Sequence, residues 1–377
     1  MNQTTVTIFL CGDFMTGRGI DQVLPHPSPP RIYEPYVTDS SEYVRLAETT
    51  HGPVPKPLGF AAVWGDALAE LNQRAPDMRM INLETAVTRS EDYWKGKAIH
   101  YRMHPANAPV LTAAGINVAA LANNHVLDWG YPGLAETIET LTKHHISCAG
   151  AGKNRNEAEA PAIVGLGGKA RVVVFSLAAK TSGVPDAWAA TDDRPGVNLL
   201  PDLSEATIQR ISDQVRRVKK QGDVVIASIH WGPNWGYAVS ADETRFSHGL
   251  IDEAGIDVVH GHSSHHVKAI EVYRGKLILY GCGDLLNDYE GIGGYEAFRG
   301  DLGLLYFARI SSETGRLLSL NMTPTQIRHF RVNYASPGDA AWLAQILNRE
   351  GRSFGTRVTI AAGNRLQLEW EELEFSP

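Results

Sequence analysis

Cysteine is scarce in this sequence of 377 residues, and its scarcity excludes several kinds of protein. Only Cys11, Cys148 and Cys282 occur, and no two of them form a Cys-x-x-Cys pair. An odd count without that spacing argues against a disulfide scaffold and against a zinc knuckle. We therefore expect a protein of a reducing compartment, the cytoplasm.

Long apolar runs and an excess of basic residues are also missing. No window approaches the ~18 uninterrupted apolar residues of a transmembrane helix. Residues 1–10 have neither the basic segment nor the apolar stretch of a signal peptide, so we expect no membrane partner. The formal net charge of −7 argues against a nucleic-acid partner.

Short apolar runs alternate with amphipathic helical patterns along most of the chain, which predicts an α/β fold with helices covering the sheets. Helices are predicted over 63–71, 134–141 and 246–251, and over 205–218 behind an N-cap at Ser204. Gly275 and Gly363 lie in the turns of two predicted hairpins. The predicted strands are residues 6–11, 78–83, 118–122, 171–177, 224–229, 256–259, 270–272, 277–280, 357–360 and 366–370.

Two segments depart from this alternation. Residues 21–60 are rich in proline and carry Tyr33, Tyr36 and Tyr43. Ordered loops of this length are uncommon and are often lids or binding loops, so we interpret this segment as a lid-like insertion that helps to choose the substrate. Residues 326–377 are interpreted as a C-terminal extension that contains the second hairpin.

Polar residues recur where the predicted strands end. In open α/β sheets, ligands bind in the crevice at the carboxyl ends of the strands. One such group alone is typical of a helix N-cap or a turn, but six in succession are hard to explain as caps. The six are Gly12-Asp13 with Gly17-Arg18, Asn82-Leu83-Glu84, Asn123-Asn124-His125 with Asp128, His230-Trp231-Gly232, Gly261-His262 with His265-His266, and Gly283-Asp284.

These motifs resemble the CapA-like family, which is named for a role in poly-γ-glutamate capsule formation and has the calcineurin-like metallophosphoesterase fold. The resemblance spans residues 12–284 and implies one domain over 1–377, with two facing β-sheets and helices outside (α/β/β/α). The matching segments are GDFMTGR, INLETAVT, LANNHVLDWG, IHWGPNW and GHSSHHVKAIEVYRGKLILYGCGD.

The resemblance also implies roles for single residues. His125 would be a proton donor that Asp128 orients. The implied metal ligands are Asp13, Glu84, Asn124, His230 and His262.

Three departures from the family pattern change the expected metal content. Met15 stands where binuclear members have a histidine, Glu84 stands where they have an aspartate, and His262 and His265 are three positions apart rather than two. One of the two metal positions has therefore lost ligands, and we expect one divalent cation per chain. The oxygen-rich set favours Ca²⁺, Mn²⁺ or Mg²⁺ over Zn²⁺.

Acid–base chemistry is the second expectation. His125 with Asp128 forms one imidazole–carboxylate pair. His262 or His265, with Asp284 or Asp13, could form another, and we choose His265 with Asp284. A carboxylate bonded to an imidazole sets its tautomer and raises its basicity, so two such pairs could remove a proton and return one.

Two arginines near the motifs are candidate substrate-binding residues. Arg18 follows the first motif and Arg102 precedes the third. Either guanidinium could bind a substrate carboxylate through two parallel hydrogen bonds. The alternative for both is a structural ion pair.

Three hypotheses of function follow. The first is a metal-dependent epimerase that acts at Cα of the C-terminal residue of a ribosomal peptide, as some CapA-like proteins of lasso-peptide biosynthesis do. The second is a metal-dependent hydrolase of phosphoesters or of amide bonds in poly-γ-glutamate-like substrates. The third is a binding protein without catalysis, which would need neither His125 nor Asp128.

Overall fold

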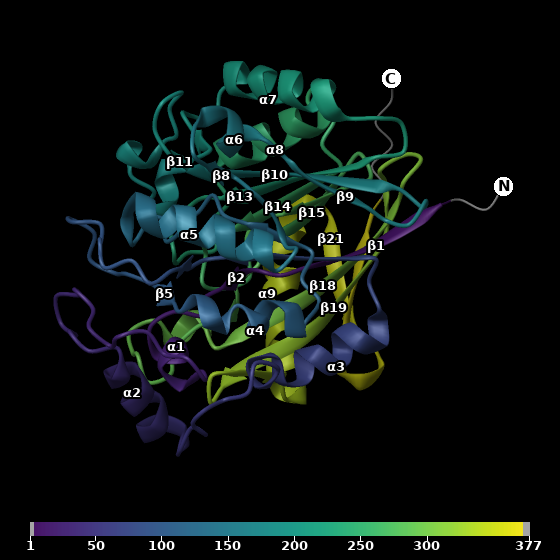
Figure 1. Ribbon diagram of the computed structural model, residues 1–377. Coiled ribbons are helices and arrows are strands. Elements are labelled where there is room, and N and C mark those ends of the chain that lie inside the picture. Colours follow the sequence, from purple (N-terminus) through teal and green to yellow (C-terminus); the bar gives the residue numbers. More distant parts are fainter. Residues whose placement is uncertain (1–3, 372–377) are drawn as a thin grey trace.

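The computed structural model describes residues 4–371, so residues 1–3 and the last six positions of the predicted C-terminal extension lie outside the described residues. Two β-sheets lie face to face in the centre, with helices on their outer faces (Figure 1). This arrangement confirms the predicted α/β sandwich. None of the described helices is long and apolar enough to cross a membrane.

The larger sheet has eleven strands, and its order along the main path is β17-β2-β3-β1-β18-β19-β22-β21. β20 pairs with β19, β6 with β3, and β7 with β6. These strands are β1 (Thr5–Leu10), β2 (Asp13–Phe14), β3 (Met78–Leu83), β6 (Val118–Ala120), β7 (Ser147–Ala149), β17 (Asp284–Leu286), β18 (Leu302–Ser311), β19 (Leu317–Arg328), β20 (Arg331–Tyr334), β21 (Thr356–Ile360) and β22 (Leu366–Trp370).

The smaller sheet has seven strands in the order β12-β10-β13-β14-β16-β15, with β9 beside β10. Two short pairs, β4 with β5 and β8 with β11, lie outside both sheets. These strands are β4 (Ala86–Val87), β5 (Arg102–Met103), β8 (Ala151–Gly152), β9 (Ala162–Gly165), β10 (Arg171–Ala179), β11 (Gly196–Val197), β12 (Leu199–Leu200), β13 (Val224–His230), β14 (Val258–His262), β15 (Ile270–Tyr273) and β16 (Lys276–Leu279).

The helices pack mainly against the outer faces of the sheets. α3 and α5 pack on the larger sheet, and α7 and α8 pack on the smaller one. The α-helices are α1 (Gly19–Val23), α2 (Ser41–His51), α3 (Gly65–Arg74), α4 (Pro109–Ala113), α5 (Gly130–Lys143), α6 (Arg155–Glu159), α7 (Glu205–Val218), α8 (Ala241–Asp252) and α9 (Pro337–Gly351). Short 3₁₀ turns complete the fold at Ala62–Trp64, Pro105–Asn107, Lys180–Ser182, Asp186–Trp188, Glu296–Phe298, Arg352–Phe354 and Ala362–Asn364.

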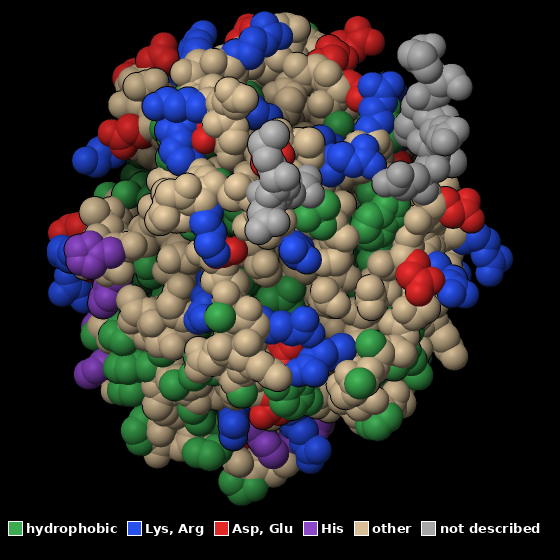
Figure 2. Space-filling model, turned by 90° about the vertical axis from the view of Figure 1, so that its right-hand side faces the viewer, with side chains coloured by type: hydrophobic (Ala, Val, Ile, Leu, Met, Phe, Trp, Pro, Cys, Tyr) green, Lys and Arg blue, Asp and Glu red, His purple; other side chains and the backbone are tan. Residues whose placement is uncertain are grey.

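The period-two alternation of strand side chains builds the core between the sheets. In β1, Ile8 and Leu10 face the other sheet, whereas Phe9 packs under the outer helices. In β10, Val172 and Val174 likewise belong to the inter-sheet core, and Phe175 packs under α7 and α8. On the face shown in Figure 2, basic and acidic side chains are interspersed, as is usual for a globular surface.

Most predicted elements are confirmed. β3 has the predicted bounds, and the Ser204 side chain accepts the Thr207 N–H at the start of α7, as an N-cap should. The strand predicted over 118–122 ends at Ala120, and the one predicted over 256–259 begins at Val258 and continues to His262.

The segment 21–60 contains a helix, α2, that the sequence did not predict. Tyr43 is buried, Tyr33 stacks on Tyr93 at 3.7 Å between ring centroids, and Tyr36 is 97% exposed. Two of the three tyrosines therefore pack within the protein. A lid function of this segment stays a prediction.

The close approach of β2 to β17 generates a testable prediction. A methyl group on Gly12 would lie 1.6 Å from the carbonyl oxygen of Gly283, so Gly12→Ala should push the two strands apart. We expect the free energy of unfolding in urea to fall by about 1–3 kcal/mol. Gly165→Ala is the matched control, because a methyl there meets no atom within 4 Å. Equal effects of the two substitutions would contradict the steric account.

Candidate metal centre

The ends of parallel strands from both sheets bring the predicted site residues together. Asp13 at the start of β2 is paired in register with Asp284 of β17 on one side and with Asn82 of β3 on the other. In the smaller sheet, His230 of β13 is in register with His262 of β14. Parallel register therefore places two carboxylates side by side and two imidazoles side by side.

All five predicted metal-ligating residues lie in one buried cluster. Asp13, His230 and His262 each offer a ligand atom within 4.8 Å of the other two. The Nδ1 atoms of His230 and His262 are 2.8 Å apart. The other ring nitrogen of His230, Nε2, lies 3.1 Å from Asn124 Oδ1 and 3.7 Å from Glu84 Oε1.

A second donor group shares Asp13 with the first. It consists of Asp13, His265 and Asp284, again with ligand atoms within 4.8 Å of one another. The sequence predicts a lost metal position because Met15 replaces a histidine, yet this group supplies a carboxylate and an imidazole on that side of Asp13. A content of one ion per chain stays a prediction.

The electrostatics of the cluster favour a cation. Burial and then the nearby Asp284 carboxylate raise the pKa of Asp13 to about 7. Burial and then Asp13 raise the pKa of Glu84 well above its ordinary value, and burial lowers the pKa of His230 and of His262. A divalent cation would offset this desolvation, and it fits a set of carboxylate and amide oxygens with imidazole nitrogens.

The first predicted acid–base pair is present. His125 Nδ1 lies 2.6 Å from Asp128 Oδ2, and His125 Nε2 lies 3.8 Å from Glu84 Oε1. Asp128 Oδ2 also accepts the Tyr101 N–H at 2.6 Å, which holds the carboxylate in place. Burial is the main cause that lowers the pKa of His125 well below its ordinary value, followed by the charge of Lys97.

Lys97 is a residue of this site that sequence reasoning missed. Its ammonium donates to Asp128 Oδ1 and to the Asn124 carbonyl, and it lies 2.9 Å from His125 Nδ1. It comes from the irregular segment between β4 and β5, where no strand end or motif marks it. A lone lysine in such a segment is usually a solvated side chain, so nothing in the local pattern distinguishes this one.

The second predicted pair is also present, at the other side of Asp13. His265 Nδ1 lies 3.0 Å from Asp284 Oδ1, and Asn287 Nδ2 donates to Asp284 Oδ2 at 2.6 Å. The Tyr289 hydroxyl lies 3.3 Å from His265 Nε2. Burial lowers the pKa of His265, but the Asp284 carboxylate outweighs it, so the net shift is upward. Sequence reasoning missed Asn287 and Tyr289. They follow the last motif, Gly283-Asp284, and belong to no motif themselves.

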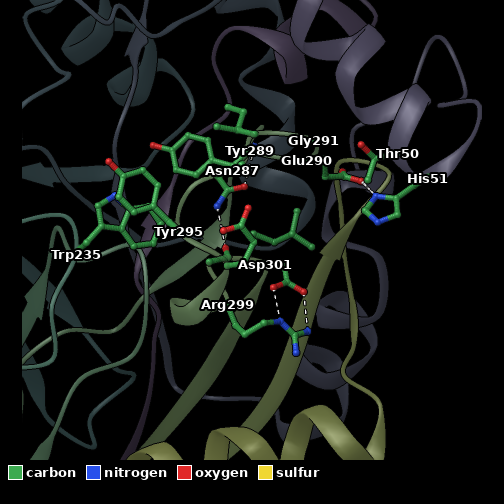
Figure 3. Close-up of a pocket in the computed structure, with 15 residues that line it drawn as sticks. Thr50, His51, Trp235, Asn287, Tyr289, Glu290, Gly291, Tyr295, Arg299 and Asp301 are labelled. Carbon is green, nitrogen blue, oxygen red and sulfur yellow. Dashed lines mark hydrogen bonds and ion pairs between the residues drawn. The ribbon is translucent and has the colours of Figure 1, made fainter.

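A pocket lies beside Tyr289 and Trp235, which both contact His265; Figure 3 shows the residues that line it. Its volume is about 430 Å³, and Asn287, Tyr289, Tyr295 and Trp235 line it. The Trp235 and His265 ring centroids are 5.5 Å apart. The pocket is therefore one side chain away from His265, and its volume is that of a small-ligand site.

The two predicted substrate-binding arginines already have internal partners. Arg18 donates to Asp288 through Nε at 3.0 Å and through Nη2 at 2.5 Å, and to Glu34 through Nη1 at 3.1 Å. Arg102 donates to the Ser90 carbonyl and to Glu91, both through Nη1, and to the Pro29 carbonyl through Nη2. Both arginines therefore make the internal ion pairs that the structural alternative expects. A role in substrate binding stays a prediction for both.

The buried Arg18 ion pairs generate a second prediction. Arg18→Met would leave the Glu34 and Asp288 carboxylates buried without their cation, so the free energy of unfolding should fall by about 3–5 kcal/mol. Arg45→Met, which removes an exposed pair with Glu42, should cost about 0–1 kcal/mol. Urea unfolding of both variants measures the difference. A stable Arg18→Met protein that loses substrate binding would restore the substrate-binding interpretation.

Comparisons with known proteins identify the family of this chain. A family model described as bacterial capsule synthesis protein PGA_cap matches residues 7–289. A probable polyglutamine synthesis accessory protein of Mycobacterium tuberculosis is 48% identical over 368 residues, which cover 97% of each chain. The PGA biosynthesis protein CapA of Bacillus subtilis is 30% identical over 216 residues, or 57% of this chain and 54% of its own.

The family match contains the residues of the cluster from Asp13 to Asp284, and it ends at the pocket residue Tyr289. It spans far more than half of the chain, and the mycobacterial relative extends the similarity over nearly all of it. The resemblance that the sequence motifs carry is thereby confirmed, and the chain belongs to the CapA-like bacterial capsule synthesis family.

Proposed function

We propose that this protein is a metal-dependent acid–base enzyme that hydrolyses amide bonds in a glutamine- or glutamate-type polymer. The observation that carries the proposal is the presence of two buried imidazole–carboxylate pairs at one donor cluster: His125–Asp128 lies beside Glu84, and His265–Asp284 lies beside Asp13. The names of the relatives, which refer to polyglutamine synthesis and to PGA biosynthesis, support the class of substrate.

Hydrolysis of an amide needs two proton transfers. A base accepts a proton from the attacking water as the water oxygen bonds to the carbonyl carbon, and an acid gives a proton to the nitrogen as the C–N bond breaks. The products are a carboxylic acid and an amine, so the atoms balance with water as the only co-reactant.

The positions of the two pairs suggest which histidine does which. His125 Nε2 faces Glu84 in the donor cluster, where a reacting water would be held, so His125 is assigned as the base. His265 Nε2 faces the pocket through Tyr289, where a substrate would enter, so His265 is assigned as the acid. Asp128 and Asp284 set the tautomers of the two rings.

The residues that would hold the cation are the five predicted ligands, of which Asp13, His230 and His262 form the first donor group, with the second group as its neighbour. When bound, a divalent cation supplies polarisation of the substrate carbonyl oxygen. The chain's own contribution is to keep these donors buried and fixed by hydrogen bonds such as that from Asn82 Nδ2 to Asp13 Oδ1, at 2.7 Å.

Epimerisation at Cα of a C-terminal peptide residue is the second candidate. The same observation favours it, because inversion needs a base on one face of Cα and an acid on the other. It differs from hydrolysis in its product, since no amide bond is broken and one Cα proton is replaced by a proton from solvent.

One assay in D₂O separates the candidates and tests the assigned residues. Metal-loaded protein is incubated with poly-γ-glutamate, poly-α-glutamine and phosphoesters, and with peptides that have a free C-terminus. New amine ends report amide cleavage, and deuterium at Cα reports epimerisation. We expect new amine ends, at a rate that falls by about 10²–10⁴-fold in His125→Asn and in His265→Asn.

The control is His145→Asn, which changes an exposed histidine on the surface. It should leave the cleavage rate unchanged, and His125→Asn should keep its metal. Cleavage that survives both site substitutions would contradict the proposal. Deuterium at Cα without cleavage would establish the epimerase, and cleavage of phosphoesters alone would establish a phosphoesterase.

A further inference from the structure

The pocket beside His265 has features that the acid–base pairs do not explain. It is built largely by the segment after β17 together with Trp235 and the end of α2 (Figure 3). Tyr289 and Trp235 both line the pocket and both contact the His265 ring, so these two side chains separate a group held in the pocket from the second acid–base pair.

One side of the pocket is aromatic. The Trp235 and Tyr295 rings are stacked, with centroids 4.3 Å apart and planes within 7° of each other. Tyr295 is 50% exposed, so a large part of its surface remains available. Flat aromatic surfaces of this kind pack well against planar groups and against short methylene chains.

The rest of the lining is mixed, with Ile292 and Ile327 beside acidic side chains. Three carboxylates line the pocket, those of Glu290, Glu296 and Asp301. The guanidinium that could balance them is Arg299, and it already donates to Asp301 at 2.8 and 2.9 Å and to Asp339 at 2.9 Å.

The other basic side chain of the described lining is also engaged. His51 Nδ1 lies 2.5 Å from Glu290 Oε2, as Figure 3 shows. Glu290 also accepts the His329 and Phe330 N–H groups, so both of its oxygens are engaged. Glu296 is exposed and accepts the Gly294 N–H, which leaves carboxylate oxygen facing solvent. At Glu296 an anionic ligand would therefore meet repulsion, whereas an N–H donor would meet an acceptor.

We propose that this pocket is a side-chain subsite that selects a neutral carboxamide, as in glutamine, over a carboxylate, as in glutamate. The planar amide packs on the Trp235–Tyr295 wall, and its NH₂ group donates to the acidic lining. This inference rests on the proposed function. Of the two proposed polymers, the glutamine type and the glutamate type, it assigns the uncharged glutamine type to this site.

The test measures equilibrium binding rather than turnover. Metal-loaded protein is titrated calorimetrically with a tri-glutamine peptide and a tri-glutamate peptide, both blocked at the ends. We expect the glutamate peptide to bind at least about tenfold more weakly. Equal affinities, or tighter binding of the glutamate peptide, would overturn the inference.

Two variants locate the effect in the pocket. Glu296→Gln should strengthen binding of the glutamate peptide by about two- to fivefold and weaken the glutamine peptide slightly, because a neutral amide oxygen replaces the carboxylate acceptor. Glu313→Gln is the matched control, because it makes the same change at an exposed residue at the far end of the β18–β19 hairpin. Tyr295→Ala should weaken the glutamine peptide severalfold.

These outcomes are separable from those of the hydrolase assay. A protein that prefers the glutamine peptide but cleaves no polymer keeps the subsite and overturns the proposed function. A protein that cleaves amide bonds but binds both peptides equally would support the proposed function and overturn the subsite. Equal effects of Glu313→Gln and Glu296→Gln on peptide binding would also overturn the subsite.

Discussion

The Asp13 carboxylate accepts a hydrogen bond from Asn82 Nδ2 at 2.7 Å and one from the Ser263 N–H at 3.2 Å, and it belongs to both donor groups. Its place depends on parallel register, because β2 lies between β17 and β3 with Asp284 and Asn82 directly alongside. The close contact at Gly12 sets the spacing of these strands. A carboxylate buried beside another is costly on its own, so the site is arranged to receive a positive charge.

The second acid–base pair derives its geometry from the same constraint. Asp284 is held beside Asp13 by the β17–β2 pairing, and it in turn holds His265. His125 lies across the cluster, near Glu84, with Asp128 fixed by the Tyr101 N–H and by Lys97. Two proton carriers thus face one cluster from two sides, and only the second adjoins the pocket. This asymmetry is the physical basis for assigning them different tasks.

Much of the fold and most of the site follow from local patterns in the sequence. The strands before the motifs are short, apolar and uninterrupted, so β3 and β13 were predictable, and the polar residues at their ends predicted a shared crevice. The long β18–β19 hairpin and α9 were not predicted, because no polar motif follows either of them. Lys97, Asn287 and Tyr289 reach the site only through tertiary packing. From the sequence, Arg18 resembles a free anion-binding residue. Its ion pairs with Glu34 and Asp288, which are distant in sequence, appear only in the folded structure.

The most direct test of this account is the metal content of Asp13→Asn, measured by elemental analysis beside the wild-type protein and His125→Asn after equal metal loading. The substitution preserves shape but removes the one carboxylate that both donor groups share. The account predicts about one divalent ion per chain in the wild type and in His125→Asn, and about tenfold less or lower in folded Asp13→Asn. Metal retained at the wild-type level in Asp13→Asn would contradict the central place of this carboxylate.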